Sequence, residues 1–177
     1  MKRSRVIALS AISAGFAVLF MLAGAVIPVL DYSAIFMASL CTMIPLAKKS
    51  WQGGLMTYLA TSLLCFIFFI GVNPAMVVTF AIFFGAHPTV SFILRERKLN
   101  NILSTVIKTV WFVASAIVIY VFFSSFLFEE SILTNQTFQK FAYLIVGIGG
   151  GLLFIVYDLL ITRFQGMLDK TIEKLKL

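Results

Sequence analysis

The stretch SAIFMASLCTMIPLAKK, residues 33–49, decides how many times the chain crosses a membrane. Its apolar part, Ser33–Ala47, is shorter than the roughly 20 apolar residues that a transmembrane helix usually needs. Two lysines follow it directly. If this segment spans the membrane, the chain has six spans, and otherwise it has five.

The rest of the chain is strongly apolar. Of its 177 residues, 61% are hydrophobic and 12% are charged, and the mean hydropathy is +1.05. A soluble domain of this size cannot bury so much apolar surface. The composition therefore predicts an all-α integral membrane protein, with spans at about residues 6–29, 33–47, 51–70, 74–94, 103–128 and 137–162.

The basic residues favour six spans. If the amino terminus is inside, all of the 14 Lys and Arg residues except Lys140 lie on or near the inner side. Without the short span, the basic residues Arg95, Arg97 and Lys98 would move outside. The acidic residues Glu129 and Glu130 would move inside, and both changes go against the positive-inside rule. We therefore expect a compact six-helix bundle with both termini in the cytoplasm. Because the net charge of +7 is grouped between apolar runs, we expect membrane lipid and no nucleic acid as a partner.

The chain after Thr162 has a different pattern. In residues 163–177, RFQGMLDKTIEKLKL, apolar residues recur at helical spacing with lysines between them. This pattern predicts a cytoplasmic amphipathic helix on the inner leaflet, separate from the transmembrane domain at residues 1–162. The alternative is that span six continues beyond the membrane, since Gly166 could act as a hinge or as a break.

Small residues in the first span predict a close helix contact. Ala11 and Gly15 are four residues apart, as are Ser10 and Ala14, so each pair lies on one helix face. Such faces let another helix approach closely in lipid. The contact could be internal to the bundle, or Ala11 and Gly15 could form the interface with a partner subunit.

The sixth span contains GIGGG at residues 147–151. Gly147 and Gly151 have the same four-residue spacing, which predicts close packing against a neighbouring helix. The alternative is that the bare backbone of this segment lines a ligand cavity.

Three ionisable residues are predicted inside the membrane at similar depths: His87, Lys108 and Asp158. Such groups normally face protein and pair with one another, as His87 with Asp158 or Lys108 with Asp158 would do. Pro88 also frees the carbonyl group of Phe84, which could accept a hydrogen bond from this cluster or from water. The three residues either hold the bundle together, with Lys108 reaching to the interface, or contact a ligand.

The sequence contains no recognisable catalytic or metal-binding motif. Cys41, Cys65 and the single histidine are too few and too far apart for a zinc site. Paired carboxylates, a phosphate-binding glycine loop and a nucleophile beside a base do not occur either. We therefore expect no enzyme activity, no metal and no cofactor, with an intramembrane hydrolase as the alternative.

The chain resembles the substrate-binding S components of energy-coupling factor (ECF) transporters, which are small six-helix membrane proteins of prokaryotes. The most specific part of the resemblance is a basic start, Lys2, Arg3 and Arg5, followed by the face of Ala11 and Gly15. The resemblance implies a plasma-membrane protein whose first helix binds a transmembrane coupling subunit, energised by two ATPase subunits. It also implies a vitamin or another small micronutrient as the substrate.

Three further stretches resemble uncharacterised members of this family from Gram-positive bacteria: MTYLATSLL at 56–64, FFGAHP at 83–88 and YDLLITR at 157–163. Two outer loops are shorter than the family's, at 30–32 and 71–73, and only residues 129–136 could form a lid. This favours a small or apolar ligand. The residues expected to bind it are Asn73, Glu129, Glu130, Tyr143 and Gly150.

A second function fits the same patterns. A membrane interaction or assembly protein that transports nothing could use its small-residue helix faces to bind another membrane protein.

Overall fold

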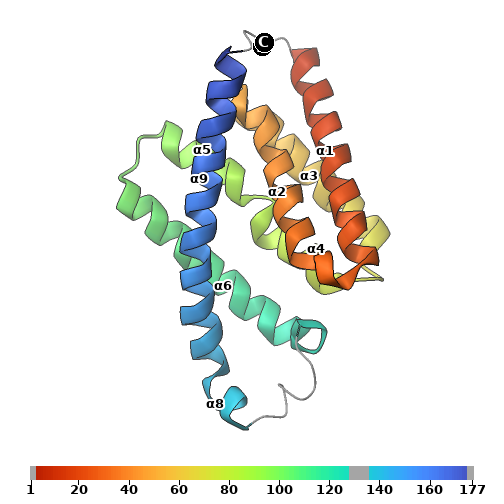
Figure 1. Cartoon of the computed structure of the whole chain (residues 1–177), viewed down its shortest axis with the longest axis vertical. Coiled ribbons are helices and arrows are strands. Elements are labelled where there is room, and N and C mark those ends of the chain that lie inside the picture. The colour runs from red at the N-terminus through yellow and green to blue at the C-terminus, as the bar shows by residue number, and fades with distance from the viewer. Residues whose placement is uncertain (1–2, 128–135, 175–177) are drawn as a thin grey trace.

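The computed structural model describes residues 3–127 and 136–174, and every element in these ranges is helical (Figure 1). The elements in chain order are α1 Arg3–Val26, η1 Pro28–Leu30, α2 Asp31–Ala47, α3 Trp51–Phe69, α4 Pro74–Thr79, η2 Phe80–Phe84, α5 His87–Glu96, α6 Asn101–Leu127, α8 Gln136–Leu144, η3 Ile145–Gly149 and α9 Gly150–Lys174.

Six helical segments in the described residues are long and apolar enough to cross a membrane. They are Arg3–Val26, Pro28–Ala47, Trp51–Phe69, Pro74–Glu96, Asn101–Ser124 and Lys140–Asp169. Large apolar side chains cover the outside of the bundle, and some are almost bare, such as Val29 at 91% and Ile102 at 74% exposed. Such a surface is stable in lipid and not in water. The prediction of an all-α membrane protein with six spans is confirmed to this extent.

The second span is long enough to cross a membrane once η1 is counted together with α2. η1 extends α2 at its start, with Pro28 at the first position, where a missing N–H donor costs little. α2 packs against α1, α3, α5 and α9. Half of its span is buried, more than in any other span of the described chain. The segment that was too short by composition is therefore the centre of the bundle.

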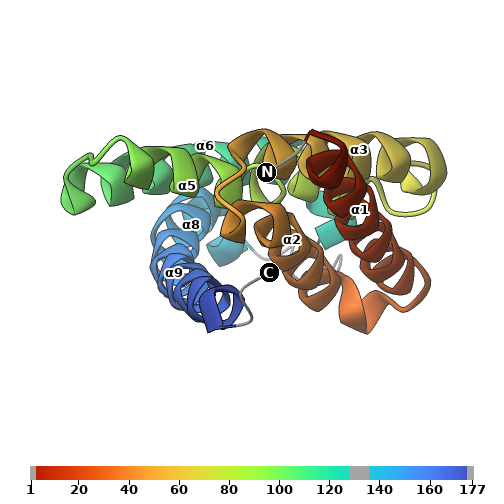
Figure 2. The ribbon, with the colours of Figure 1, turned by 90° about the horizontal axis from the view of Figure 1, so that it is seen from above.

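Figure 1 shows that α1 begins and α9 ends at the same end of the bundle, here called the terminus end, while α8 lies at the opposite, far end. Seen from above, α1, α2 and α3 form one group, and α5 and α9 lie on the other side of the bundle (Figure 2). Which end faces the cytoplasm stays a prediction.

The turn between α3 and α4 is closed by the side chain of Asn73. Asn73 Oδ1 accepts a hydrogen bond from the backbone N–H of Met76 at 3.1 Å, and Pro74 occupies the first helical position. Asn73 is therefore the N-cap of α4, which satisfies a donor that the helix itself cannot pair.

Two turns at the terminus end are closed by backbone hydrogen bonds and resemble one another. After α2, the N–H of Ser50 donates to the carbonyl of Pro45 at 3.3 Å, and that of Lys49 to Leu46 at 2.8 Å. Lys49 has a φ of 55°, in the left-handed region where glycine is usual at this position. The turn after α5 repeats the pattern around Lys98, whose φ is 52°. Both left-handed positions are therefore occupied by lysine.

The carboxy-terminal segment differs from the expected separate amphipathic helix. α9 runs through Gly166 to Lys174 without a break, as in the alternative of a continued sixth span. Phe164 and Leu168 pack against a buried cluster that includes Met43 and Phe83. A glycine inside a helix costs about 1 kcal/mol, which is less than the burial of two large apolar side chains contributes. The helix therefore continues.

Candidate functional site

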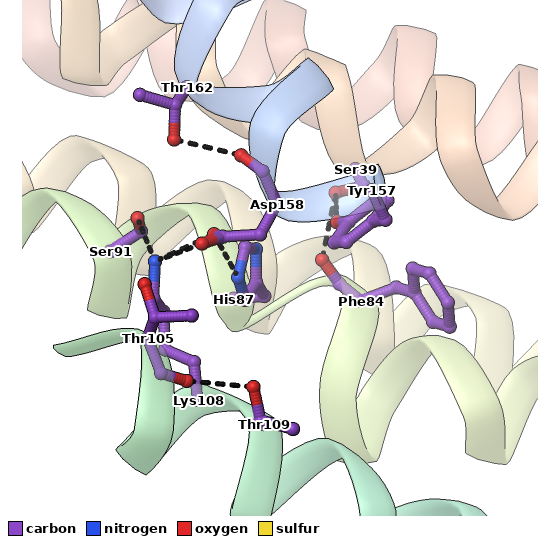
Figure 3. A network of polar contacts seen from close by, with 10 residues as sticks. All are labelled: Ser39, Phe84, His87, Ser91, Thr105, Lys108, Thr109, Tyr157, Asp158 and Thr162. Carbon is purple, nitrogen blue, oxygen red and sulfur yellow. Dashed lines mark hydrogen bonds and ion pairs between the residues drawn. The ribbon is translucent and has the colours of Figure 1, made fainter. Parts of the chain in front are cut away.

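The predicted ionisable residues meet in one cluster between α5, α6 and α9, here called the ionic cluster: His87, Lys108 and Asp158 (Figure 3). Lys108 Nζ donates to Asp158 Oδ1 at 2.6 Å and to Oδ2 at 2.7 Å, and lies 3.4 Å from Ser91 Oγ. His87 Nε2 lies 3.2 Å from Asp158 Oδ1. The three residues are 0%, 5% and 7% exposed. Lys108 therefore forms a buried ion pair and does not reach to the interface.

His87 is held mainly by contacts between its ring and neighbouring aromatic rings. The imidazole packs on Phe83, Phe154 and Tyr157, with ring centroids 5.2, 5.5 and 5.0 Å away. Neither ring nitrogen makes an aligned hydrogen bond within the described residues, although Nε2 is close to the carboxylate. Asp158 is thus bound tightly by Lys108 and only approached by His87.

A second polar group links α2, η2 and α9. The carbonyl that Pro88 frees, that of Phe84, accepts a hydrogen bond from Ser39 Oγ at 2.9 Å (Figure 3). Ser39 Oγ also lies 2.9 Å from the hydroxyl of Tyr157. Because serine has one hydroxyl hydrogen, Tyr157 is the donor in this second bond. Within the described residues, the freed carbonyl therefore accepts from Ser39 and not from the ionic cluster.

A cavity of about 300 Å³, here called the aromatic cavity, lies between α4, η2, α6 and the start of span six. Its lining reaches from Tyr32, at the far end of α2, to Tyr157. Two π-helical segments contribute to it, η2 through Phe83 and Phe84 and η3 through Val146. Because π-helical turns are rare and often occur at functional sites, their meeting at one cavity marks it as a candidate ligand site.

Phe83 separates the aromatic cavity from the ionic cluster. Its ring contacts Trp111 and Phe112 at 4.9 Å and Phe154 at 5.5 Å between centroids. On its other side it contacts the ring of His87. The cavity and the cluster are therefore neighbours with a layer of aromatic rings between them.

The residues expected to bind substrate do not meet in one place. Asn73 donates from Nδ2 to Asp31 Oδ2 at 2.8 Å and lines a different, smaller cavity of about 230 Å³. Tyr143 is 58% exposed. Glu129 and Glu130 lie outside the described residues.

Two of the expected residues contact the wall of the aromatic cavity without lining it themselves. The ring of Tyr143 lies 5.7 Å from that of Tyr120, which lines the cavity. A Cβ atom at Gly150 would be 3.2 Å from Phe112 Cε1, so this glycine lets α9 approach another lining residue.

The two small-residue rows of α1 have different surroundings. Ser10 and Ala14 are buried, and Ser10 Oγ donates to the carbonyl of Gly53 in α3 at 3.0 Å. Ala11 and Gly15 are exposed, and a Cβ atom at Gly15 would meet nothing within 4 Å. The first row therefore packs inside the bundle, and the second stays open.

The glycines of span six do not form the expected single face. A Cβ atom at Gly147 would meet nothing within 4 Å, while one at Gly151 would be 3.9 Å from Val113 in α6. The π-helical turn Ile145–Gly149 explains the difference, because its wider turn rotates Gly147 away from the face that the four-residue spacing predicts.

Sequence reasoning missed Ser39, Tyr157 and the aromatic lining of the cavity. The chain has 19 phenylalanines, and aromatic residues make up 15% of it, which is a general signal without positions. Tyr157 directly precedes Asp158, and Ser39 is a polar residue within the short span. These two positions are the local signals from which Tyr157 and Ser39 could have been found.

No group of three or more His, Cys, Asp or Glu side chains in the described parts of the chain could hold a metal ion. No family model matches this chain, and no curated protein or solved structure is significantly similar to it. Its function has to be inferred from the chemistry of its cavities.

Proposed function

We propose that this protein is the substrate-capture subunit of an ECF-type importer and that the aromatic cavity is its substrate site. The cavity is the observation that supports this most directly. Its lining includes Tyr32 at the start of α2 and Thr79 in α4, and α2 begins away from the terminus end, which is the outer side in the predicted orientation. A capture subunit would need its site there to take substrate from outside.

The lining of the cavity favours a small, flat and mainly apolar substrate. Its volume of about 300 Å³ is at the lower end of the usual range for small-molecule sites. Aromatic rings such as Phe112 and Phe154 offer faces for stacking, and the hydroxyl-bearing residues Tyr32 and Thr79 offer a few polar contacts. This chemistry suits a heteroaromatic micronutrient better than a charged or strongly polar one.

Filling the cavity is expected to remove the bound substrate. In the Ala116→Phe variant, the new ring would occupy space that Ala116 now lines, so the affinity for the ligand should fall at least about tenfold, which corresponds to about 1.4 kcal/mol. The measurement is native mass spectrometry of gently purified protein, to detect a small molecule that remains bound.

Ala114→Phe is the matched control, because Ala114 lies on the exposed side of the same helix. It should keep the wild-type ligand, and both variants should show wild-type helicity. A wild-type protein without any bound small molecule, or an Ala116→Phe variant that keeps its ligand, would contradict the assignment of the site.

The open face of α1 provides the second test, which concerns coupling. Leucine at Gly15 is expected to abolish co-purification with a coupling subunit and its two ATPases, because it would block close helix approach. The protein itself should stay folded, since nothing lies within 4 Å of that position. Leucine at the exposed Ala114, on α6, should leave the complex intact.

A Gly15→Leu variant that still assembles would argue against this face as the coupling interface. If the protein instead binds another membrane protein through α1 and holds no small molecule, the alternative of an interaction or assembly protein gains support.

A further inference from the structure

A second cavity opens near the terminus end, between α5, α6 and α9, on the other side of the aromatic layer. Its volume is about 270 Å³, and we call it the polar cavity. Its lining residues from three helices include Arg95, Ser104, Thr105, Lys108, Asp158 and Gln165. None of them lines the aromatic cavity, so a ligand here would be separate from the proposed substrate.

The amide of Gln165 is the first sign of a ligand. The residue is only 3% exposed, yet its Nε2 has no hydrogen-bond partner among the described residues. A buried donor without an acceptor costs about 1–3 kcal/mol, so such groups are usually satisfied by something. Because Gln165 lines the polar cavity, a ligand bound there would be placed to supply the acceptor.

The charges around the cavity favour an anion. Both carboxylate oxygens of Asp158 are held by Lys108, so these two charges compensate each other. Among the described residues of the lining, Arg95 is the cation without a buried counter-charge. In the described part of the chain, Arg95 pairs with Asp169 at 3.4 Å, between side chains that are 47% and 40% exposed, and such exposed pairs are weak.

We propose that the polar cavity binds a phosphate group, either of an anionic phospholipid headgroup or of a free phosphate. Arg95 of α5, Gln165 of α9 and the hydroxyl of Ser104 or Thr105 of α6 surround the space from three sides. A tetrahedral oxyanion can accept hydrogen bonds from three directions at once, whereas a carboxylate accepts mainly in one plane. Figure 3 shows Thr105 beside Lys108, and both residues line the polar cavity.

The position of the cavity fits both sources of phosphate. It lies at the end of the bundle, where lipid headgroups meet transmembrane helices, and basic pockets between helices are known to hold anionic headgroups. Further exposed basic residues at the same end, Arg97, Lys98 and Arg163, would raise the local concentration of anions.

Two binding measurements test the proposal and distinguish the sources. Delipidated full-length protein in a neutral detergent is titrated with inorganic phosphate by calorimetry. In parallel, protein from nanodiscs of mixed phosphatidylglycerol and phosphatidylcholine is examined by native mass spectrometry for retained lipid. Binding in the first measurement identifies a free phosphate, and selective retention of phosphatidylglycerol in the second identifies a headgroup. If no binding is detected in either measurement, the proposal is overturned.

The variants Arg95→Gln and Gln165→Leu are each expected to weaken the observed binding about tenfold or more, because each removes a hydrogen bond to a charged group. Arg97→Gln is the matched control, since it removes the same charge from the end of the same helix but does not line the polar cavity. Equal losses in Arg95→Gln and Arg97→Gln would show unspecific attraction and overturn the site. Arg95 is exposed, so its variant remains informative even if Gln165→Leu fails to fold.

Discussion

Replacing Lys108 with methionine is expected to lower the free energy of unfolding by about 3–5 kcal/mol, because the Asp158 carboxylate would stay buried without its cation. The structure gives this carboxylate two short bonds from Lys108 and only one approach from His87, at 3.2 Å and without hydrogen-bond alignment. Reversible unfolding in mixed detergent, followed by tryptophan fluorescence, measures the loss.

The double variant Lys108→Met/Asp158→Leu should recover part of this loss, since no charge is then left unpaired. Lys140→Met is the matched control at an exposed site, with an expected change of at most about 1 kcal/mol. Simply additive losses in the double variant would show that Lys108 and Asp158 do not stabilise one another.

The second large effect is expected at Gly24, where α1 packs tightly against α2. A Cβ atom there would lie 2.6 Å from Ala34 Cβ and 3.0 Å from Met76 Sδ. The Ala34 methyl group is fixed to the α2 backbone, so the two helices would have to move apart. Relative to Gly15→Ala, the Gly24→Ala variant should be less stable by about 1–3 kcal/mol, measured by the same unfolding experiment.

Gly15→Ala is a close control, because it lies in the same helix and gains the same helix propensity with nothing within 4 Å. The propensity gain therefore cancels in the comparison. Equal stability of the two variants would mean that α1 and α2 are less closely packed than described.

The spans and the ionic cluster could be predicted because both follow from local rules. Apolar runs and basic residues determine where helices cross, and the helical rise places His87, Lys108 and Asp158 at similar depths. The choice between His87 and Lys108 as the partner of Asp158 could not be made, because it depends on how three helices rotate about their axes.

The aromatic cavity and the positions of the glycines in span six could not be predicted from local rules. Ser39 meets the carbonyl of Phe84 only because α2 lies at the centre of the bundle. Gly147 leaves its predicted face because η3 adopts a π-helical turn, which no spacing in the sequence announces. The amphipathic pattern of residues 163–177 places Gln165 in a surface tail, but α9 continues along the bundle and Gln165 is buried there.

The left-handed lysines at 49 and 98 have a consequence for how the chain enters the membrane. Glycine at these two turns would relieve about 1 kcal/mol of backbone strain each. In the predicted orientation, however, both lysines belong to the cytoplasmic charge that directs insertion. Once the helices are in place, that charge has no further directing role, but the strain persists. These two lysines therefore serve membrane insertion at a lasting cost in the stability of the folded protein.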